Sequence, residues 1–128
     1  MRPRRAKRSK GFTLLEIMIV VSLLGLLAVL AIPIFVKARK VSQGRRIVHD
    51  ARMMDTAISQ WALDHGKKDG DPITGFEDQI QTYMKTPWKP VDILGNSYVI
   101  GTVGPTQIQI SAATKSALAG VGIDWGPY

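Results

Sequence analysis

The sequence predicts an α+β fold in which one long N-terminal helix packs on a small antiparallel sheet. An apolar run covers residues 12–36 and carries one charge, Glu16. Apolar residues then recur at helical spacing as far as residue 61. Two stretches nearer the C-terminus, 94–103 and 107–111, have the composition and alternation of strands. A chain of 128 residues forms at most one domain, so the helix must supply one layer of its core.

Charge and hydropathy divide the chain into four parts. We expect a basic leader at 1–11, a transmembrane helix at 12–36, an amphipathic helix continuing it at 37–66, and a small globular region at 67–128. The leader holds six Lys and Arg and no acid, whereas the rest holds eleven basic and ten acidic residues. Because the folded part is nearly neutral, we expect no nucleic-acid partner. A basic block ahead of an apolar span instead favours retention of the N-terminus in the cytoplasm.

The apolar run is long enough to cross a bilayer. Its 25 residues would make a helix of roughly 37 Å. A cleaved secretory signal would have an apolar core of only about 7–15 residues, and Glu16 would be foreign to it. A plain membrane anchor explains the length but not the glutamate. Since a charge near mid-bilayer costs about 2.5–3.5 kcal/mol, we expect Glu16 to have a partner.

The start of this run carries a specific motif. It reads K-G-F-T-L-L-E, and a proline follows near the outer end of the apolar stretch. This pattern resembles the N-terminus of the type IV pilin and type II secretion pseudopilin superfamily. The residues that match in type and spacing are Lys10, Gly11, Phe12, Thr13, Leu14, Leu15, Glu16 and Pro33. The resemblance covers residues 10–36 and implies a pilin-like fold with the prepilin cleavage and methylation motif.

The resemblance implies how the motif is used. A prepilin peptidase would cut between Gly11 and Phe12, and the new amine of Phe12 would be N-methylated. Gly11 lacks a Cβ, so a protease can approach its backbone closely. In the family, the Phe12 amine of one subunit meets the glutamate of a neighbour, which would make Glu16 an assembly residue together with Pro33. Such a pair fixes register more than it adds stability.

Partners and location follow from the same resemblance. The chain would be a structural subunit of an envelope filament, either a type IV pilin or a type II secretion pseudopilin. Its partners would be the prepilin peptidase/methyltransferase, copies of itself and related pilins, an inner-membrane assembly platform, and membrane lipid before assembly. It would cross the bacterial inner membrane once, with a cytoplasmic N-terminus and a periplasmic or extracellular C-terminal domain. The alternative is a monomeric, single-pass, membrane-anchored binding module that shares only the prepilin signature.

Charges after the span weaken the argument from topology. Five basic residues, Lys37, Arg39, Lys40, Arg45 and Arg46, follow the apolar run closely. Their number is close to that of the leader, so the positive-inside rule favours a cytoplasmic N-terminus only weakly. The peptidase signature, not the charge count, decides the expected orientation.

The amphipathic helix has one apolar stripe, which we interpret as the core face rather than as a coiled-coil surface. The stripe consists of Ile47, Ala51, Met54, Ile58 and Trp61. Gly66 suits the position just after the helix end. Pro33 should kink the helix, and Gly44 is a second soft point. We expect His49 and His65 to be solvated or capping residues rather than metal ligands.

The globular region predicts short elements. Thr74 and Glu77 have capping-box spacing at the start of a helix at 74–84. Trp88, in a proline-containing loop, should anchor that loop on the core. A three-residue connection at 104–106 should join the strands 94–103 and 107–111. A tail through Ile123, Trp125 and Tyr128 should pack across the sheet.

No catalytic pattern stands out, so we expect no enzyme and no cofactor. The chain has no cysteine, no G-x-S-x-G motif and no glycine-rich phosphate loop. Major pseudopilins of the superfamily that this chain resembles bind calcium. In this chain, oxygen ligands could come from Asp92, Asn96 and Asp124. Calcium requires six to eight oxygens, however, and no loop here is rich in carboxylates. We therefore predict turn-forming roles for these residues and no metal site.

Overall fold

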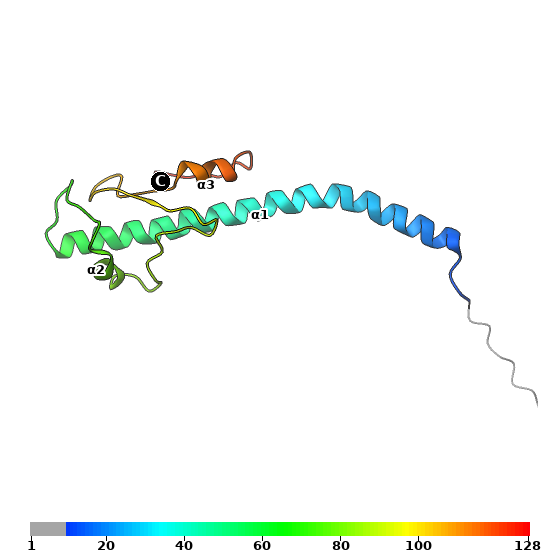
Figure 1. Ribbon diagram of the computed structural model, residues 1–128, viewed down its shortest axis with the longest axis horizontal. Helices are drawn as coiled ribbons and strands as arrows, with labels where there is room; N and C mark the ends of the chain where they lie inside the picture. Colours follow the sequence, from blue (N-terminus) through cyan, green and yellow to red (C-terminus); the bar gives the residue numbers. More distant parts are fainter. Residues whose placement is uncertain (1–9) are drawn as a thin grey trace, which may run out of the picture. The chain divides into compact units, whose positions relative to one another are not determined.

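The computed structural model describes residues 10–128, so most of the expected leader at 1–11 lies outside the described residues. In chain order the elements are α1 (Leu14–Asp64), α2 (Glu77–Gln81), β1 (Val99–Ile100), β2 (Ile108–Gln109) and α3 (Ala112–Ala117) (Figure 1). A long helix with a small antiparallel sheet confirms the predicted α+β class. The chain divides into a part that ends at Val36 and a part from Lys37 to Tyr128.

Helix α1 ends as the sequence predicts. The N–H of Gly66 donates to the carbonyl of Leu63 at 3.3 Å, and the N–H of Lys67 donates to that of Ala62 at 2.8 Å. These two bonds form a Schellman motif, which requires a left-handed residue, and Gly66 has a φ of 61°. The exposed His65 also places its ring Nδ1 2.9 Å from the carbonyl oxygen of Trp61. The prediction that His65 is a solvated or capping residue agrees with this exposed position at the end of the helix.

The second part has its hydrophobic core on one face of α1. The five predicted stripe residues are all buried, with exposed fractions of 0 or 1%. The side chains that pack on this stripe come from the loops, the sheet and the tail. They include Ile73, Ile80, Tyr98, Val103, Ile108, Ile110, Leu118 and Tyr128. The interpretation of the stripe as a core face is therefore confirmed, and the partly buried Trp88 packs against this core as expected.

The sheet is smaller than predicted. Strands β1 and β2 pair Val99 with Gln109 and Ile100 with Ile108, so they occupy only the middle of the two predicted segments. The predicted three-residue connection at 104–106 is wrong, because residues 101–107 join the strands. Residues flanking β1 pair elsewhere, since isolated bridges join Thr102 to Pro72 and Ser97 to Val91. Pairing with these loops replaces the extension of the hairpin.

The short helix α2 begins three residues later than predicted. Its N-cap is Phe76, which makes no side-chain capping bond, so the predicted capping box of Thr74 and Glu77 is wrong. Glu77 Oε2 instead accepts a hydrogen bond from the N–H of Gly75 at 2.9 Å. The ring of Phe76 lies 5.1 Å from that of Trp61. This packing fixes where the chain turns into the helix.

The C-terminal segment contacts α1 at two points and contains a helix that the sequence analysis missed. Helix α3 is capped by Ser111, whose Oγ accepts from the N–H of Thr114 at 3.3 Å. After it, the side chain of Ile123 packs against Gly44, which is buried. The missing Cβ at Gly44 leaves room for this side chain, a role beyond the predicted weakening of the helix. The hydroxyl of Tyr128 lies 3.4 Å from Asp55 Oδ2. The tail thus packs on α1.

Two side-chain amides connect the loops to α1. Gln107 Nε2 donates to the carbonyl of Asp55 at 2.9 Å and to Ser59 Oγ at 2.8 Å. Trp61 Nε1 donates to Gln79 Oε1 at 3.1 Å, which joins the central core residue to α2. Buried polar groups are costly unless they are paired, so these bonds fix the hairpin and α2 on the helix.

Candidate functional site

The junction between Gly11 and Phe12 lies just outside α1. Both residues are exposed, and the Phe12 side chain keeps 81% of its accessible surface. A Cβ placed on Gly11 would meet no atom within 4 Å among the described residues. The fold of the described chain thus gives no steric reason for glycine at this position.

Thr13 and Glu16 form a reciprocal capping box at the start of α1. The N–H of Glu16 donates to Thr13 Oγ1 at 3.2 Å, and the N–H of Thr13 donates to Glu16 Oε2 at 3.3 Å. Two of the backbone donors that a helix start leaves unpaired are satisfied in this way. This role is not among the sequence-based predictions, although T-L-L-E has the T-x-x-E spacing of a capping box.

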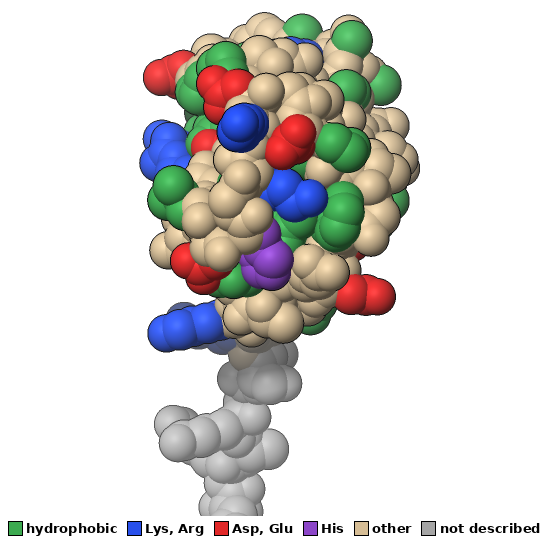
Figure 2. Space-filling model, turned by 90° about the vertical axis from the view of Figure 1, so that its left-hand side faces the viewer, with side chains coloured by type: hydrophobic (Ala, Val, Ile, Leu, Met, Phe, Trp, Pro, Cys, Tyr) green, Lys and Arg blue, Asp and Glu red, His purple; other side chains and the backbone are tan. Residues whose placement is uncertain are grey.

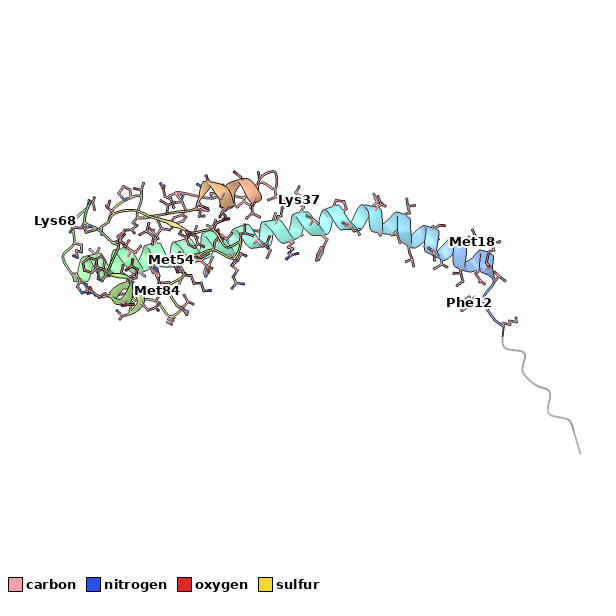
Figure 3. All side chains as sticks on the ribbon, in the orientation of Figure 1. Phe12, Met18, Lys37, Met54, Lys68 and Met84 are labelled. Carbon is pink, nitrogen blue, oxygen red and sulfur yellow. The ribbon has the colours of Figure 1, made fainter. Side chains whose placement is uncertain are left out.

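Exposed apolar side chains dominate α1 as far as Val36, and Figure 3 shows side chains projecting from the ribbon near Met18. By length and composition, α1 is the one helix among the described residues able to cross a membrane. Its most apolar 18-residue window has a mean hydropathy of 2.9 and no buried residue. An exposed apolar surface of this extent requires lipid or other protein to cover it.

Pro33 lies inside α1, and the helix continues past it. Proline lacks an N–H, so the carbonyl four residues earlier, that of Val29, loses its usual helical partner. The kink expected at Pro33 and its role in assembly stay predictions. Of the four predicted site residues, the structure gives a bonded neighbour to Glu16, and that neighbour is Thr13 rather than Phe12.

The candidate calcium ligands have structural roles. Asp92 is buried, and its Oδ1 accepts from the N–H of Leu94 at 2.8 Å and that of Asn96 at 3.0 Å. Its Oδ2 accepts from the hydroxyl of Thr114. Asp124 instead caps a turn, where its Oδ1 accepts from the N–H of Gly126. Within residues 10–128 no three His, Cys, Asp or Glu side chains gather as metal ligands.

Comparisons with known proteins agree with the motif. The family model described as "Prokaryotic N-terminal methylation motif" matches residues 6–32. Type IV major fimbrial protein FimA of Dichelobacter nodosus is 33% identical, over 91% of this chain and 62% of its own length. Type II secretion system core protein G of Klebsiella pneumoniae is 34% identical, over 63% of this chain and 54% of its own length. These matches support the resemblance of the chain to the type IV pilin and pseudopilin superfamily.

The similarity to these proteins reaches beyond the N-terminal motif. Core protein G of Escherichia coli (strain K12) is 28% identical, over 79% of this chain and 77% of its own length. The chain spans less than two thirds of the length of the fimbrial protein. No solved structure matches the chain.

Proposed function

We propose that this chain is a structural subunit of an envelope filament of the type IV pilus or type II secretion class. The observation that carries the proposal is the combination of an exposed apolar stretch in the first half of α1 with an N-terminal methylation motif at its start. The relatives named major fimbrial protein and type II secretion system core protein support the same class. We propose a purely structural role, without catalysis or a cofactor.

Processing would precede assembly. In this proposal a prepilin peptidase cuts between Gly11 and Phe12, and the new amine of Phe12 is methylated. Among the described residues no atom lies within 4 Å of a Cβ placed at Gly11, so this position is open to recognition by an external enzyme. Cleavage also removes the six basic residues of the leader. The domain organisation that follows is a leader at 1–11, a membrane and assembly helix at 12–36, an amphipathic helix at 37–66 and a globular pilin-like region at 67–128.

Before assembly the helix would lie in the bacterial inner membrane. The N-terminus would be cytoplasmic, where the leader is read, and the region from residue 37 onward would lie on the periplasmic side. Lipid would cover the apolar side chains of 12–36 at this stage. The assembly platform would then transfer the subunit from lipid into the growing filament, where neighbouring helices replace the lipid.

Glu16 would have two roles in this sequence of events. In the single subunit its Oε2 closes the first turn of α1 with Thr13. In the filament the carboxylate would also face the cationic amine of Phe12 from a neighbouring subunit. A buried ion pair needs further hydrogen bonds to offset the loss of water, and the N–H of Thr13 supplies one.

The experiment compares the parent chain with Gly11→Val in bacteria that carry a prepilin peptidase and an assembly system. Intact mass of membrane-extracted protein gives the N-terminus, and shearing followed by pelleting gives the filament yield. We expect the parent to begin at Phe12 and to enter filaments. Gly11→Val should keep its leader and stay in the membrane, because the added side chain touches only the peptidase. Lys10→Gln is the matched control, since it alters the adjacent leader residue without adding a Cβ at the cleavage position.

Two results would contradict the proposal. A parent chain that keeps Met1, or that begins at Ile32, would exclude the predicted cleavage. A parent that begins at Phe12 but never pellets with filaments would instead favour the monomeric, membrane-anchored binding module.

A further inference from the structure

A group of basic side chains follows the apolar run and has no role in the functions described above. This basic collar consists of Lys37, Arg39, Lys40, Arg45 and Arg46 on α1. Four of the five are exposed and Lys40 is half-buried. No Asp or Glu occurs between residues 37 and 49, so the collar carries five positive charges without an acid beside them in the sequence.

The collar surrounds the helix instead of marking one face. Successive residues of an α-helix are rotated by about 100°, so these five positions point in all directions around the axis. A protein partner that docks on one side would meet only some of them. A layer of headgroups surrounds a helix that crosses a membrane on every side, and long basic side chains reach such a layer readily.

The rest of the second part has the opposite charge. Residues 47–128 hold six Lys and Arg against nine Asp and Glu, a net charge of −3. Figure 2 views the end of this part where α1 finishes, and there acidic and basic side chains are interspersed. An anionic surface would therefore attract the collar and repel the remainder of the domain.

The collar also begins at the right depth. Lys37, labelled in Figure 3, directly follows Val36, the last residue of the apolar run. Along a helix, Lys40 comes only about 4.5 Å after Lys37, and a headgroup layer is roughly 5–7 Å thick. Arg45 and Arg46 come about 12–14 Å after Lys37 along the helix, which is about 5–9 Å beyond such a layer and within the screening length of about 8–10 Å for charges in physiological salt.

We propose that the basic collar binds the phosphate headgroups of anionic phospholipids. This contact would fix the depth of the helix and keep the start of the amphipathic helix at the membrane surface before assembly. The proposal rests on the proposed function for the membrane location of residues 12–36. It adds the chemical class of lipid and the residues that select it.

The experiment measures which lipid gathers around the collar. The chain has no cysteine, so Ser42→Cys gives a unique attachment site for a fluorescent donor within the collar, at an exposed position. The full chain is reconstituted in phosphatidylcholine vesicles that contain a minority of phosphatidylglycerol. Energy transfer to acceptor-labelled phosphatidylglycerol is compared with transfer to acceptor-labelled phosphatidylcholine at equal content. A donor with a short transfer distance does not detect lipid near the start of α1, because the helix from Leu14 to Ser42 is about 42 Å long.

We expect transfer to the anionic lipid to exceed transfer to phosphatidylcholine by at least about threefold, because one basic residue near an anionic surface favours binding by about fivefold. The ratio should fall toward one in Lys37→Gln/Arg39→Gln/Lys40→Gln. It should also fall when salt is raised to about 1 M, where the screening length is about 3 Å. The matched control, Lys68→Gln/Lys85→Gln/Lys89→Gln, removes the same charge from exposed positions outside the collar and should keep the parent ratio.

A parent ratio near one, or the same loss in the control as in the collar variant, would overturn the proposal. If the parent ratio is near one and the collar variant loses only filament yield, the cations serve contacts between subunits instead. Vesicle measurements need no filaments. A failure of the proposed assembly function therefore leaves this test intact, and a failure of lipid selection leaves assembly intact.

Discussion

Thr13 and Glu16 bind each other through both their backbone amides and their side chains at the first turn of α1. This relationship gives the glutamate a role in the lone subunit, before any neighbour is present. In a membrane, an N–H without a protein partner has no water to bind, so a cap at this position is worth more than on a soluble helix. A carboxylate near the N-terminal end of a helix also meets the positive end of the helix dipole.

The first prediction concerns this cap. Thr13→Ala removes the side-chain acceptor for the N–H of Glu16 and should destabilise the first turn by about 0.5–2 kcal/mol. Amide hydrogen exchange of the chain in micelles should then accelerate at Glu16, while amides beyond Ser22 keep their rates. Thr13→Ser keeps the hydroxyl and is the control. Equal protection in the alanine and serine variants would mean that the capping box does not form in the membrane-like environment.

A comparison of two T-x-x-E segments shows what the sequence can predict locally. Thr13 and Glu16 form the box, whereas Thr74 and Glu77 have the same spacing and do not. Near Thr13 nothing else in the described chain competes for the helix start. Near Thr74, the packing of Phe76 on Trp61 determines where the helix begins, because burial of an aromatic ring outweighs a capping bond. A tertiary contact of this kind cannot be read from spacing alone.

The second prediction concerns the core of the part from Lys37 to Tyr128. Expressed without residues 1–36, this part should be soluble and folded, since the stripe on α1 meets its partners within it. Trp61→Ala should lower the free energy of unfolding by about 3–5 kcal/mol, because the ring is fully buried. Leu63→Ala, two residues away with 82% of its surface exposed, is the control and should cost little. Denaturant unfolding measures both, and equal midpoints would mean that the Trp61 ring does not belong to the core.

The third prediction tests the packing of Ile123, in the C-terminal tail, against Gly44. A Cβ at Gly44 would lie 2.3 Å from Ile123 Cδ1 and 2.9 Å from its Cγ1, so Gly44→Ala forces the tail to move. Such overpacking costs about 1–3 kcal/mol, whereas alanine favours the helix by about 1 kcal/mol. We expect a net loss of stability in the parent. In an Ile123→Ala background the same change should stabilise the domain, and a double-mutant cycle measures the difference. Additive effects would show that Ile123 does not lie on Gly44.

The fourth prediction concerns alkaline pH. Burial raises the pKa of the Tyr98 phenol above its ordinary value of 10.0, with Asp50 and Asp92 adding to the effect. The unfolded chain therefore ionises first, and Tyr98 stabilises the fold fully below pH 10.0 but progressively less above it. Between about pH 10 and 12 its contribution should fall by up to about 1.4 kcal/mol per pH unit. Tyr98→Phe should show a shallower loss of unfolding free energy over this range, and parallel curves would contradict the raised pKa.

The parts of the fold that the sequence predicts are those set by regular spacing. The stripe from Ile47 to Trp61 and the helix end at Gly66 follow from periodicity and from one residue type. The packing of Ile123 on Gly44 and the pairing of Thr102 with Pro72 join segments that are far apart in the chain. Such contacts depend on which loop reaches which surface, and a single sequence gives no periodic signal for them.

The last prediction separates the two roles of Glu16. Glu16→Gln keeps a side chain that can accept the Thr13 N–H bond, since glutamine also serves in capping boxes, but it removes the charge. Glu16→Leu removes both and also relieves the cost of a charge in lipid. The parent, Glu16→Gln and Glu16→Leu should all be cleaved after Gly11 and should all enter the membrane. Glu16→Leu should insert at least as well as the parent. Total membrane-bound protein is the control for insertion.

Filament yield then shows whether assembly depends on the hydrogen bond between Glu16 and Thr13 or on the negative charge of Glu16. If the carboxylate must pair with the Phe12 amine of a neighbour, the glutamine and leucine variants should both fail to assemble, because that cation is left unpaired in a dry bundle. Glu16→Asp should be intermediate, since it keeps the charge with a shorter reach. If the cap alone matters, Glu16→Gln should assemble as the parent does, and only leucine should fail. Normal yield from Glu16→Leu would show that assembly needs neither role, and that the glutamate serves the lone subunit only.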